Sequence, residues 1–109
     1  MNIRNPLVSI VMNCHNGSKY LKDSLDSVFT QSFKEWELIF FDNFSSDNSK
    51  EILHQYNDKR IKYFSSKEKL ELYKARNLAV NKCTGDYICF LDTDDMWSAD
   101  KLEKQLEYF

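Results

Sequence analysis

The chain has 109 residues, of which 42% are apolar and 15% aromatic, so it can form one globular domain with a single core. Its 15 basic residues nearly balance 17 acidic ones, and this argues against nucleic-acid binding, which requires a basic face. With three cysteines, no secretion signal and no membrane-spanning run, we expect a reduced, cytoplasmic protein.

Four short apolar runs are spaced along the chain as buried strands, at residues 7–12, 36–41, 61–64 and 87–91. After the first run, Leu21, Leu25, Val28 and Phe29 recur at helical intervals and predict one apolar helix face. The second run is followed by residues 45–47, which are typical of a helix N-cap.

The helix expected after that cap has an apolar inner face, formed by Ile52, Leu53 and Tyr56. A third helix carries five small or apolar residues and ends near Gly85, which suits a C-terminal cap. These five are Leu72, Ala75, Leu78, Ala79 and Val80. The last helix follows Ser98 and is expected to bury Leu102, Leu106 and Phe109. Phe40, Phe41 and Phe90 in the strands are expected in the core.

Strands that alternate with helices in this way predict βαβ units, and therefore a mainly parallel sheet in a Rossmann-like α/β domain spanning residues 1–109. Ligands of such sheets bind beyond the carboxyl ends of the strands. Polar residues stand at those ends, in segments 13–16, 42–43 and 92–95. We expect all three segments to meet at one edge.

The most informative segment is the acidic one, in which Asp92, Asp94 and Asp95 directly follow a strand. Two carboxylates about 4 Å apart repel by about 1 kcal/mol in water, so a folded cluster favours a neutralising cation. Oxygen ligands select a hard ion such as Mg²⁺ or Mn²⁺, which keeps positions open for phosphate. Asp95 is also consistent with capping the turn.

Other ligand-binding motifs do not fit. With only Gly17 and Gly85, the chain has neither of the common glycine-rich phosphate loops. Residues 92–103 have the length of a calcium-binding loop, but Met96 stands at a ligand position and Trp97 where glycine is obligatory.

Several motifs, taken together and in order, resemble the family-two glycosyltransferases of the GT-A fold. The first comprises residues 8–16, 20–21, 27–28 and 31–33, and the second comprises residues 38–43 and 45–47. The third comprises residues 75–77, 85–88 and 90–95. The resemblance covers essentially the whole chain.

This resemblance implies strand order 3-2-1-4, helices on both faces, and transfer of a sugar from a nucleotide diphosphate with inversion. It implies Mn²⁺ or Mg²⁺ as cofactor, held by Asp92 and Asp94 as an Asp-x-Asp element. The nucleotide-sugar-binding residues it implies are Asn13, His15, Asn16, Asp42, Asn43, Arg76, Asp92 and Thr93. On its own, Arg76 is equally consistent with a surface ion pair.

The sequence departs from the family pattern around the expected base pocket, at Met12, Asn13, His15, Asn43 and Phe44. UDP is the expected nucleotide on family frequency. The family's catalytic base lies in a downstream half that binds the saccharide acceptor, so no catalytic residue is expected in residues 1–109. We therefore expect a donor-binding portion that is inactive alone.

The family further implies a role in cell-surface polysaccharide synthesis, with the full-length enzyme cytoplasmic and peripheral at the inner face of the membrane. The fourth strand is expected at an uncovered sheet edge, which favours a homo-oligomer. Two alternatives stay open: a non-catalytic nucleotide-binding module and a receiver-like signalling domain. The receiver reading lacks an acid pair after the first strand and an aspartate after the third.

Overall fold

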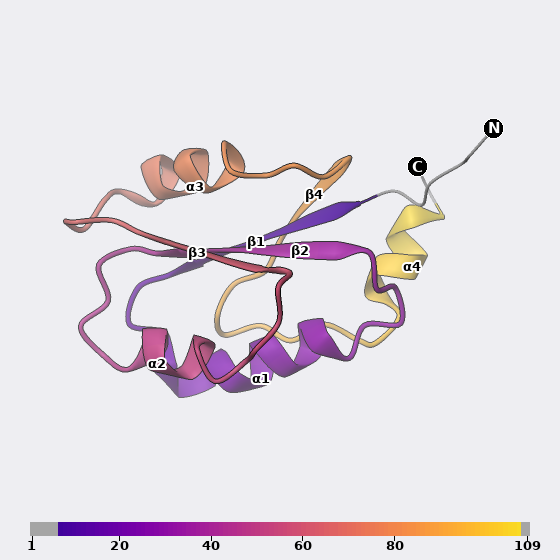
Figure 1. The fold of residues 1–109 in the computed structure, drawn as a ribbon, viewed down its shortest axis with the longest axis horizontal. Helices are drawn as coiled ribbons and strands as arrows, with labels where there is room; N and C mark the ends of the chain where they lie inside the picture. Colours follow the sequence, from indigo (N-terminus) through magenta and orange to yellow (C-terminus); the bar gives the residue numbers. More distant parts are fainter. Residues whose placement is uncertain (1–6, 108–109) are drawn as a thin grey trace.

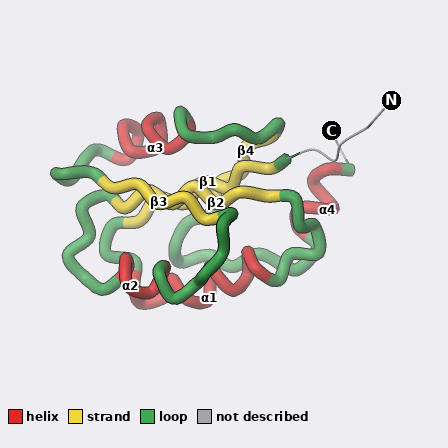
Figure 2. The backbone as a smooth tube through the Cα atoms, viewed as in Figure 1, coloured by secondary structure: helices red, strands yellow, loops and turns green. Residues whose placement is uncertain are grey.

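A computed structural model describes residues 7–107, in which strands and helices alternate along the chain (Figures 1 and 2). The elements are β1 (Val8–Cys14), α1 (Ser18–Phe29), β2 (Trp36–Asp42), α2 (Ser49–Leu53), β3 (Ile61–Ser65), α3 (Leu72–Val80), β4 (Tyr87–Phe90) and α4 (Lys101–Leu106). None of the helices in this part of the chain has the length and apolar character needed to cross a membrane.

The strands form one parallel sheet in the order β3-β2-β1-β4, which confirms the expected topology. Val8 pairs with both Trp36 and Tyr87, and Cys14 pairs with Asp42. β1 therefore runs two residues beyond its predicted end. The helix α3 covers one face of the sheet, while α1 and α2 cover the other (Figure 1).

The larger core lies between the sheet and α1. Parallel strands with both faces covered are apolar throughout, and every residue of β2 is buried. The predicted inner face of α1 is confirmed, because Leu21, Leu25 and Val28 are fully buried. Each such side chain contributes about 1.5–3 kcal/mol through burial.

The helix α4 joins the same core near the end of α1, through Leu102. The buried Gln31 fixes this junction: its amide nitrogen donates to Ser98 O at 2.6 Å, and its oxygen accepts from Leu102 N at 3.1 Å. Phe109, expected to be buried in this helix, lies outside the described residues.

The smaller core lies under α3, where Ala75 and Ala79 pack on Val11, Ile39 and Phe41. Alanine leaves room for the helix backbone to approach the sheet. The prediction that Phe90 lies in the core is wrong, and two leucines of α3 are exposed as well. The side chains of Leu72, Leu78 and Phe90 are 54%, 43% and 50% exposed. The reason is that α3 packs on β1 and β2, while β4 lies at the sheet edge.

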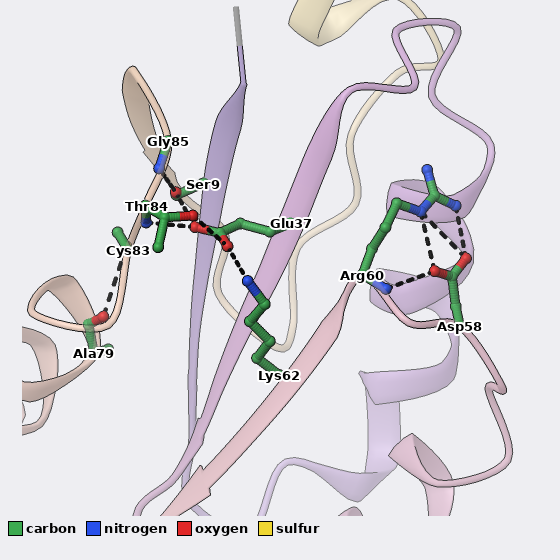
Figure 3. Close-up of polar contacts among 9 residues, drawn as sticks. All are labelled: Ser9, Glu37, Asp58, Arg60, Lys62, Ala79, Cys83, Thr84 and Gly85. Carbon is green, nitrogen blue, oxygen red and sulfur yellow. Dashed lines mark hydrogen bonds and ion pairs between the residues drawn. The ribbon is translucent and has the colours of Figure 1, made fainter.

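A buried polar cluster ties the start of the sheet together on the α3 side (Figure 3). Glu37, 3% exposed, accepts hydrogen bonds from Ser9 Oγ at 2.5 Å, Thr84 N at 2.6 Å and Lys62 Nζ at 2.7 Å. Burial alone would raise the pKa of the Glu37 carboxyl. The hydrogen bonds from Lys62, Ser9 and Thr84 outweigh burial and lower this pKa to about 2.

Gly85 belongs to this cluster and is not the predicted helix cap. The helix α3 ends at Val80, and Gly85 has no positive φ. A Cβ atom at Gly85 would lie 2.6 Å from Ser9 Oγ and 2.8 Å from Leu7 O. Glycine is therefore required here for close approach of the α3–β4 connection to β1.

The helix α2 is shorter than predicted and starts later. Its N-cap is Asn48, whose side chain makes no capping hydrogen bond. Asp47, in the predicted capping segment, accepts from both Ser49 N at 3.0 Å and Ser49 Oγ at 2.6 Å. Tyr56 lies beyond the helix, where it stacks on Phe29 with ring centroids 5.0 Å apart.

Candidate functional site

A pocket of about 460 Å³ opens at the carboxyl ends of β1 and β4, beside the start of α1. Its position agrees with the rule that parallel sheets bind ligands where strand order reverses, because β1 pairs with β2 on one side and β4 on the other. The lining residues are Asn13, His15, Asn16, Gly17, Lys19, Tyr20, Asp92, Thr93 and Asp94.

The acidic segment after β4 contributes Asp92, Thr93 and Asp94 to the wall of this pocket. Carboxylate oxygens of Asp92, Asp94 and Asp95 lie within 4.8 Å of one another, and all three residues are exposed. The three donors are hard oxygen ligands that leave coordination positions free for water or phosphate, so the set suits Mg²⁺ or Mn²⁺.

Asn13, at the carboxyl end of β1, also lines this pocket. Its Oδ1 is buried and has no hydrogen-bond partner within residues 7–107. A buried acceptor without a partner costs about 1–3 kcal/mol. The strand end and the acidic loop therefore both contribute polar residues to the pocket wall.

His15 is held in a fixed orientation on the pocket wall. Its Nδ1 lies 2.7 Å from Asn43 O, and a carbonyl oxygen can only accept, so Nδ1 carries the proton. The other ring nitrogen, Nε2, lies 3.4 Å from Asn16 Nδ2. His15 thus lines the pocket with both ring nitrogens in contact with protein groups.

Asn16 connects the two loops behind the pocket. It has a left-handed φ of 53°, which asparagine tolerates better than most residues. Its Oδ1 accepts from Ser46 N at 2.7 Å and from Asp47 N at 3.2 Å. The β1–α1 turn is thereby fixed to the β2–α2 loop.

Asp42 and Asn43 do not line this pocket, and their side chains are engaged inside the protein. Asp42 accepts from Ser45 N at 3.0 Å and from Tyr63 Oη at 2.9 Å. Burial and the neighbouring Asp42 carboxylate raise the pKa of Tyr63 to about 12. Asn43 accepts from Leu70 N at 2.8 Å and donates to Leu70 O at 2.9 Å.

Arg76 lies beside the acidic segment rather than within the pocket wall. One of its terminal nitrogens is 4.0 Å from Asp92 Oδ1, and its guanidinium lies 5.7 Å from the centre of the Phe90 ring. The side chains of Arg76 and Asp92 are 45% and 66% exposed, so this contact stabilises the fold little.

Sequence reasoning missed three residues of the pocket wall: Gly17, Lys19 and Tyr20 at the start of α1. They could have been found by extending the strand-end rule to the first turn of the following helix, since that turn leaves the same edge of the sheet. Lys19 adds a cation beside the acidic segment, which suits an anionic ligand.

Comparison with known proteins identifies the class. The family model described as "Glycosyl transferase family 2" matches residues 9–109. The chain therefore belongs to glycosyl transferase family 2, and its sheet and helices form the Rossmann-like fold of GT-A glycosyltransferases. This membership confirms the resemblance inferred from the motifs and removes the receiver-like reading.

Among relatives, the chain is 39% identical over 100 residues to UDP-Glc:alpha-D-GlcNAc-diphosphoundecaprenol beta-1,3-glucosyltransferase WfgD of Escherichia coli. This match covers 92% of the chain but 40% of the relative, so the chain spans less than half the length of that enzyme.

Two solved structures share the fold. TarS 1-349 from S. aureus in complex with UDP-GlcNAc is 25% identical with a TM-score of 0.86, covering 93% of this chain and 30% of that one. Mannosyltransferase PcManGT from Pyrobaculum calidifontis, in complex with GDP-Man and Mn²⁺, is 20% identical with a TM-score of 0.89. That match covers 96% of this chain and 32% of the mannosyltransferase.

Proposed function

We propose that this domain binds the nucleoside diphosphate of a sugar donor, with Asp92 and Asp94 holding Mn²⁺ or Mg²⁺ on the diphosphate. The observation that carries this proposal is the convergence of three carboxylates after β4, two of which, Asp92 and Asp94, line a pocket at the carboxyl ends of the strands. UDP is the proposed nucleotide, supported by the donor named in the Escherichia coli relative and by the ligand of TarS.

In this proposal, the remaining residues bind different parts of the donor. Asn13, His15 and Asn16 lie at the end of β1, where they face the nucleoside. Thr93 lies between the two metal-binding aspartates and faces the phosphates, while Arg76 approaches the same segment from α3. Asp42 and Asn43 contribute by holding the loops behind the pocket.

Charge at the leaving group governs the chemistry. The departing nucleoside diphosphate gains negative charge as the bond to the sugar breaks, and a bound divalent ion would stabilise that charge as a Lewis acid. Asp92 and Asp94 would orient the diphosphate through that ion, and Lys19 lines the same pocket with a positive charge. We propose transfer with inversion, which requires a general base near the acceptor hydroxyl.

We place that general base and the saccharide acceptor site outside residues 1–109. Relatives that match this chain are more than twice its length, which leaves room for an acceptor-binding part. The Escherichia coli relative is named for a diphosphoundecaprenol-linked acceptor, and a similar lipid-linked saccharide would place the whole enzyme in the cytoplasm at the inner membrane face. This supports a role in cell-surface polysaccharide synthesis.

We also propose that the isolated domain self-associates through β4. Among the described strands, β4 pairs with β1 alone, and Ile88 and Phe90 on it are 41% and 50% exposed. An uncovered edge strand with apolar side chains is a template for pairing with a second copy.

Calorimetry tests the donor proposal. UDP, GDP and dTDP are titrated into the 109-residue protein with and without Mn²⁺, and we expect UDP to bind most tightly and only with the metal.

Asp94→Asn is expected to weaken binding by about tenfold or more, because it removes a charged ligand. Glu103→Gln removes an equal charge from α4, near the opposite end of α1, and is the matched control. Equal UDP affinity with and without Mn²⁺ would reject metal-dependent binding.

A further inference from the structure

The acidic segment after β4 is anchored to α1 by one buried hydroxyl group. Ser24, which is fully buried in the second turn of α1, donates from Oγ to Thr93 O at 2.8 Å and also contacts Asp95 O. Figure 2 shows the connection after β4 passing along α1. A helix formed early in the chain thus holds a loop about seventy residues later.

A second contact fixes the same loop at the start of α1. A Cβ atom at Gly17 would lie 2.7 Å from Thr93 Oγ1 and 3.2 Å from Cys14 Sγ. Gly17 has φ −95°, which any residue adopts, so the glycine is required for space rather than for backbone freedom. Thr93 is therefore packed against the helix as well as hydrogen-bonded to it.

These anchors act on the backbone between the carboxylates. The carbonyl groups of Thr93 and Asp95 face α1, and the side chains of Asp92 and Asp94 line the pocket. Within the segment itself, one backbone hydrogen bond of 3.1 Å joins Asp95 N to Asp92 O. Three carboxylates within 4.8 Å repel one another, so the loop needs external contacts to keep them together before a cation binds.

We infer that Ser24 is a positioning residue for the cation site, because it holds the loop in the conformation in which Asp92 and Asp94 converge. This inference rests on the proposed function, in which those two aspartates bind a divalent ion. Ser24 touches neither metal nor donor. By ordering the loop before the ion binds, Ser24 lowers the entropic cost of metal binding.

Ser27 provides a matched control on the same helix. It is also buried, at 8% exposure, but its hydroxyl donates to Ser24 O at 2.6 Å within α1 and does not reach the acidic segment. Ser24→Ala and Ser27→Ala therefore each remove one buried hydroxyl from α1. Only the first change disconnects the loop.

The test measures Mn²⁺ affinity from the free-ion electron paramagnetic resonance signal, with Mn²⁺ alone and with Mn²⁺ plus UDP. Urea unfolding of each variant gives its stability separately. We expect Ser24→Ala to weaken Mn²⁺ binding about fivefold, the effect of one hydrogen bond, and Ser27→Ala to change it less than about twofold. Gly17→Ala, which displaces Thr93 from the other anchor, is expected to weaken Mn²⁺ binding as well.

The outcomes separate this inference from the proposed function. If the unmodified protein binds Mn²⁺ and Ser24→Ala binds it equally well, Ser24 has no positioning role and only this inference falls. If the unmodified protein binds no Mn²⁺ with or without UDP, both are rejected. Should Ser24→Ala fail to fold, Ser24→Cys decides, because its thiol occupies the same position but is a weak hydrogen-bond donor: unchanged Mn²⁺ affinity in that variant also rejects the inference.

Discussion

Lys62 and Glu37 form an ion pair of 2.7 Å in which only one partner is buried: the lysine side chain is 44% exposed and the glutamate side chain 4%. Together with the hydrogen bonds from Ser9 and Thr84, this pair joins β1, β2, β3 and the connection before β4 (Figure 3). The cluster stabilises the end of the sheet opposite the pocket, so it offers a way to change stability without touching the site.

Stability is expected to fall in acid through Glu37. Its carboxyl pKa is lowered to about 2 from an ordinary value of 4.5, so the folded state favours the charged form. The resulting contribution, about 3 kcal/mol at most, is complete above pH 4.5 and is lost as the pH falls toward 2. Urea midpoints of the protein and of Glu37→Gln, measured from pH 7 to pH 2.5, check this.

In Glu37→Gln the loss of stability between pH 4.5 and pH 2.5 should be clearly smaller, while stability at pH 7 is lower. Lys62→Met, which removes one partner of the same carboxylate, should fall between the two proteins at pH 7. Parallel acid profiles for Glu37→Gln and the unmodified protein would contradict the assignment.

The two glycines are expected to respond differently to alanine. In Gly85→Ala the new Cβ meets backbone atoms, Leu7 O and Ser9 N, each at 2.8 Å, which cannot rotate away. In Gly17→Ala the nearest atom is the side-chain hydroxyl of Thr93. We expect Gly85→Ala to cost about 1–3 kcal/mol of unfolding free energy and Gly17→Ala to cost less. Urea unfolding of both variants decides, and an equal or reversed order would be inconsistent with these contacts.

The isolated chain is expected to bind donor without transferring sugar. The described residues supply the pocket and the acidic segment, and we place the catalytic base outside residues 1–109. UDP-sugars are incubated with the protein, Mn²⁺ and saccharide acceptors, and released UDP is measured against a protein-free blank. Robust transfer to any acceptor would show that the catalytic residues lie within this chain.

Self-association is expected to depend on β4. Ile88→Lys places a charge on the exposed edge and should shift the light-scattering mass toward a single chain. Tyr73→Lys, an exposed aromatic on α3, makes the same kind of change away from β4 and should leave the mass unaltered. A single-chain mass for the unmodified protein at high concentration would remove the basis for edge pairing.

Much of the fold was predictable because strand and helix periodicities are local. The apolar runs gave all four strands, and Leu21, Leu25 and Val28 defined the inner face of α1. Exposure of Phe90 was not predictable in this way, because an edge strand and a central strand can have the same composition. Whether a strand is covered depends on elements elsewhere in the chain.

In the candidate site, too, residues in a local pattern were predictable and those that depend on distant contacts were not. Asp92 and Asp94 stood out because acids after a buried strand form a local pattern, and the structure places both at the pocket. Ser24 gave no signal, since a serine within an amphipathic helix has no local feature that points to Thr93 and Asp95. Nor did sequence show that Asp42 is already bonded to Tyr63.

The most direct test of the account is anomalous diffraction from crystals of this protein grown with Mn²⁺ and UDP. We predict an anomalous peak within bonding distance of carboxylate oxygens of Asp92 and Asp94, with diphosphate oxygens completing the coordination. Well-ordered UDP in the pocket with no anomalous peak at these aspartates, or with their carboxylates turned apart, would contradict the central claim.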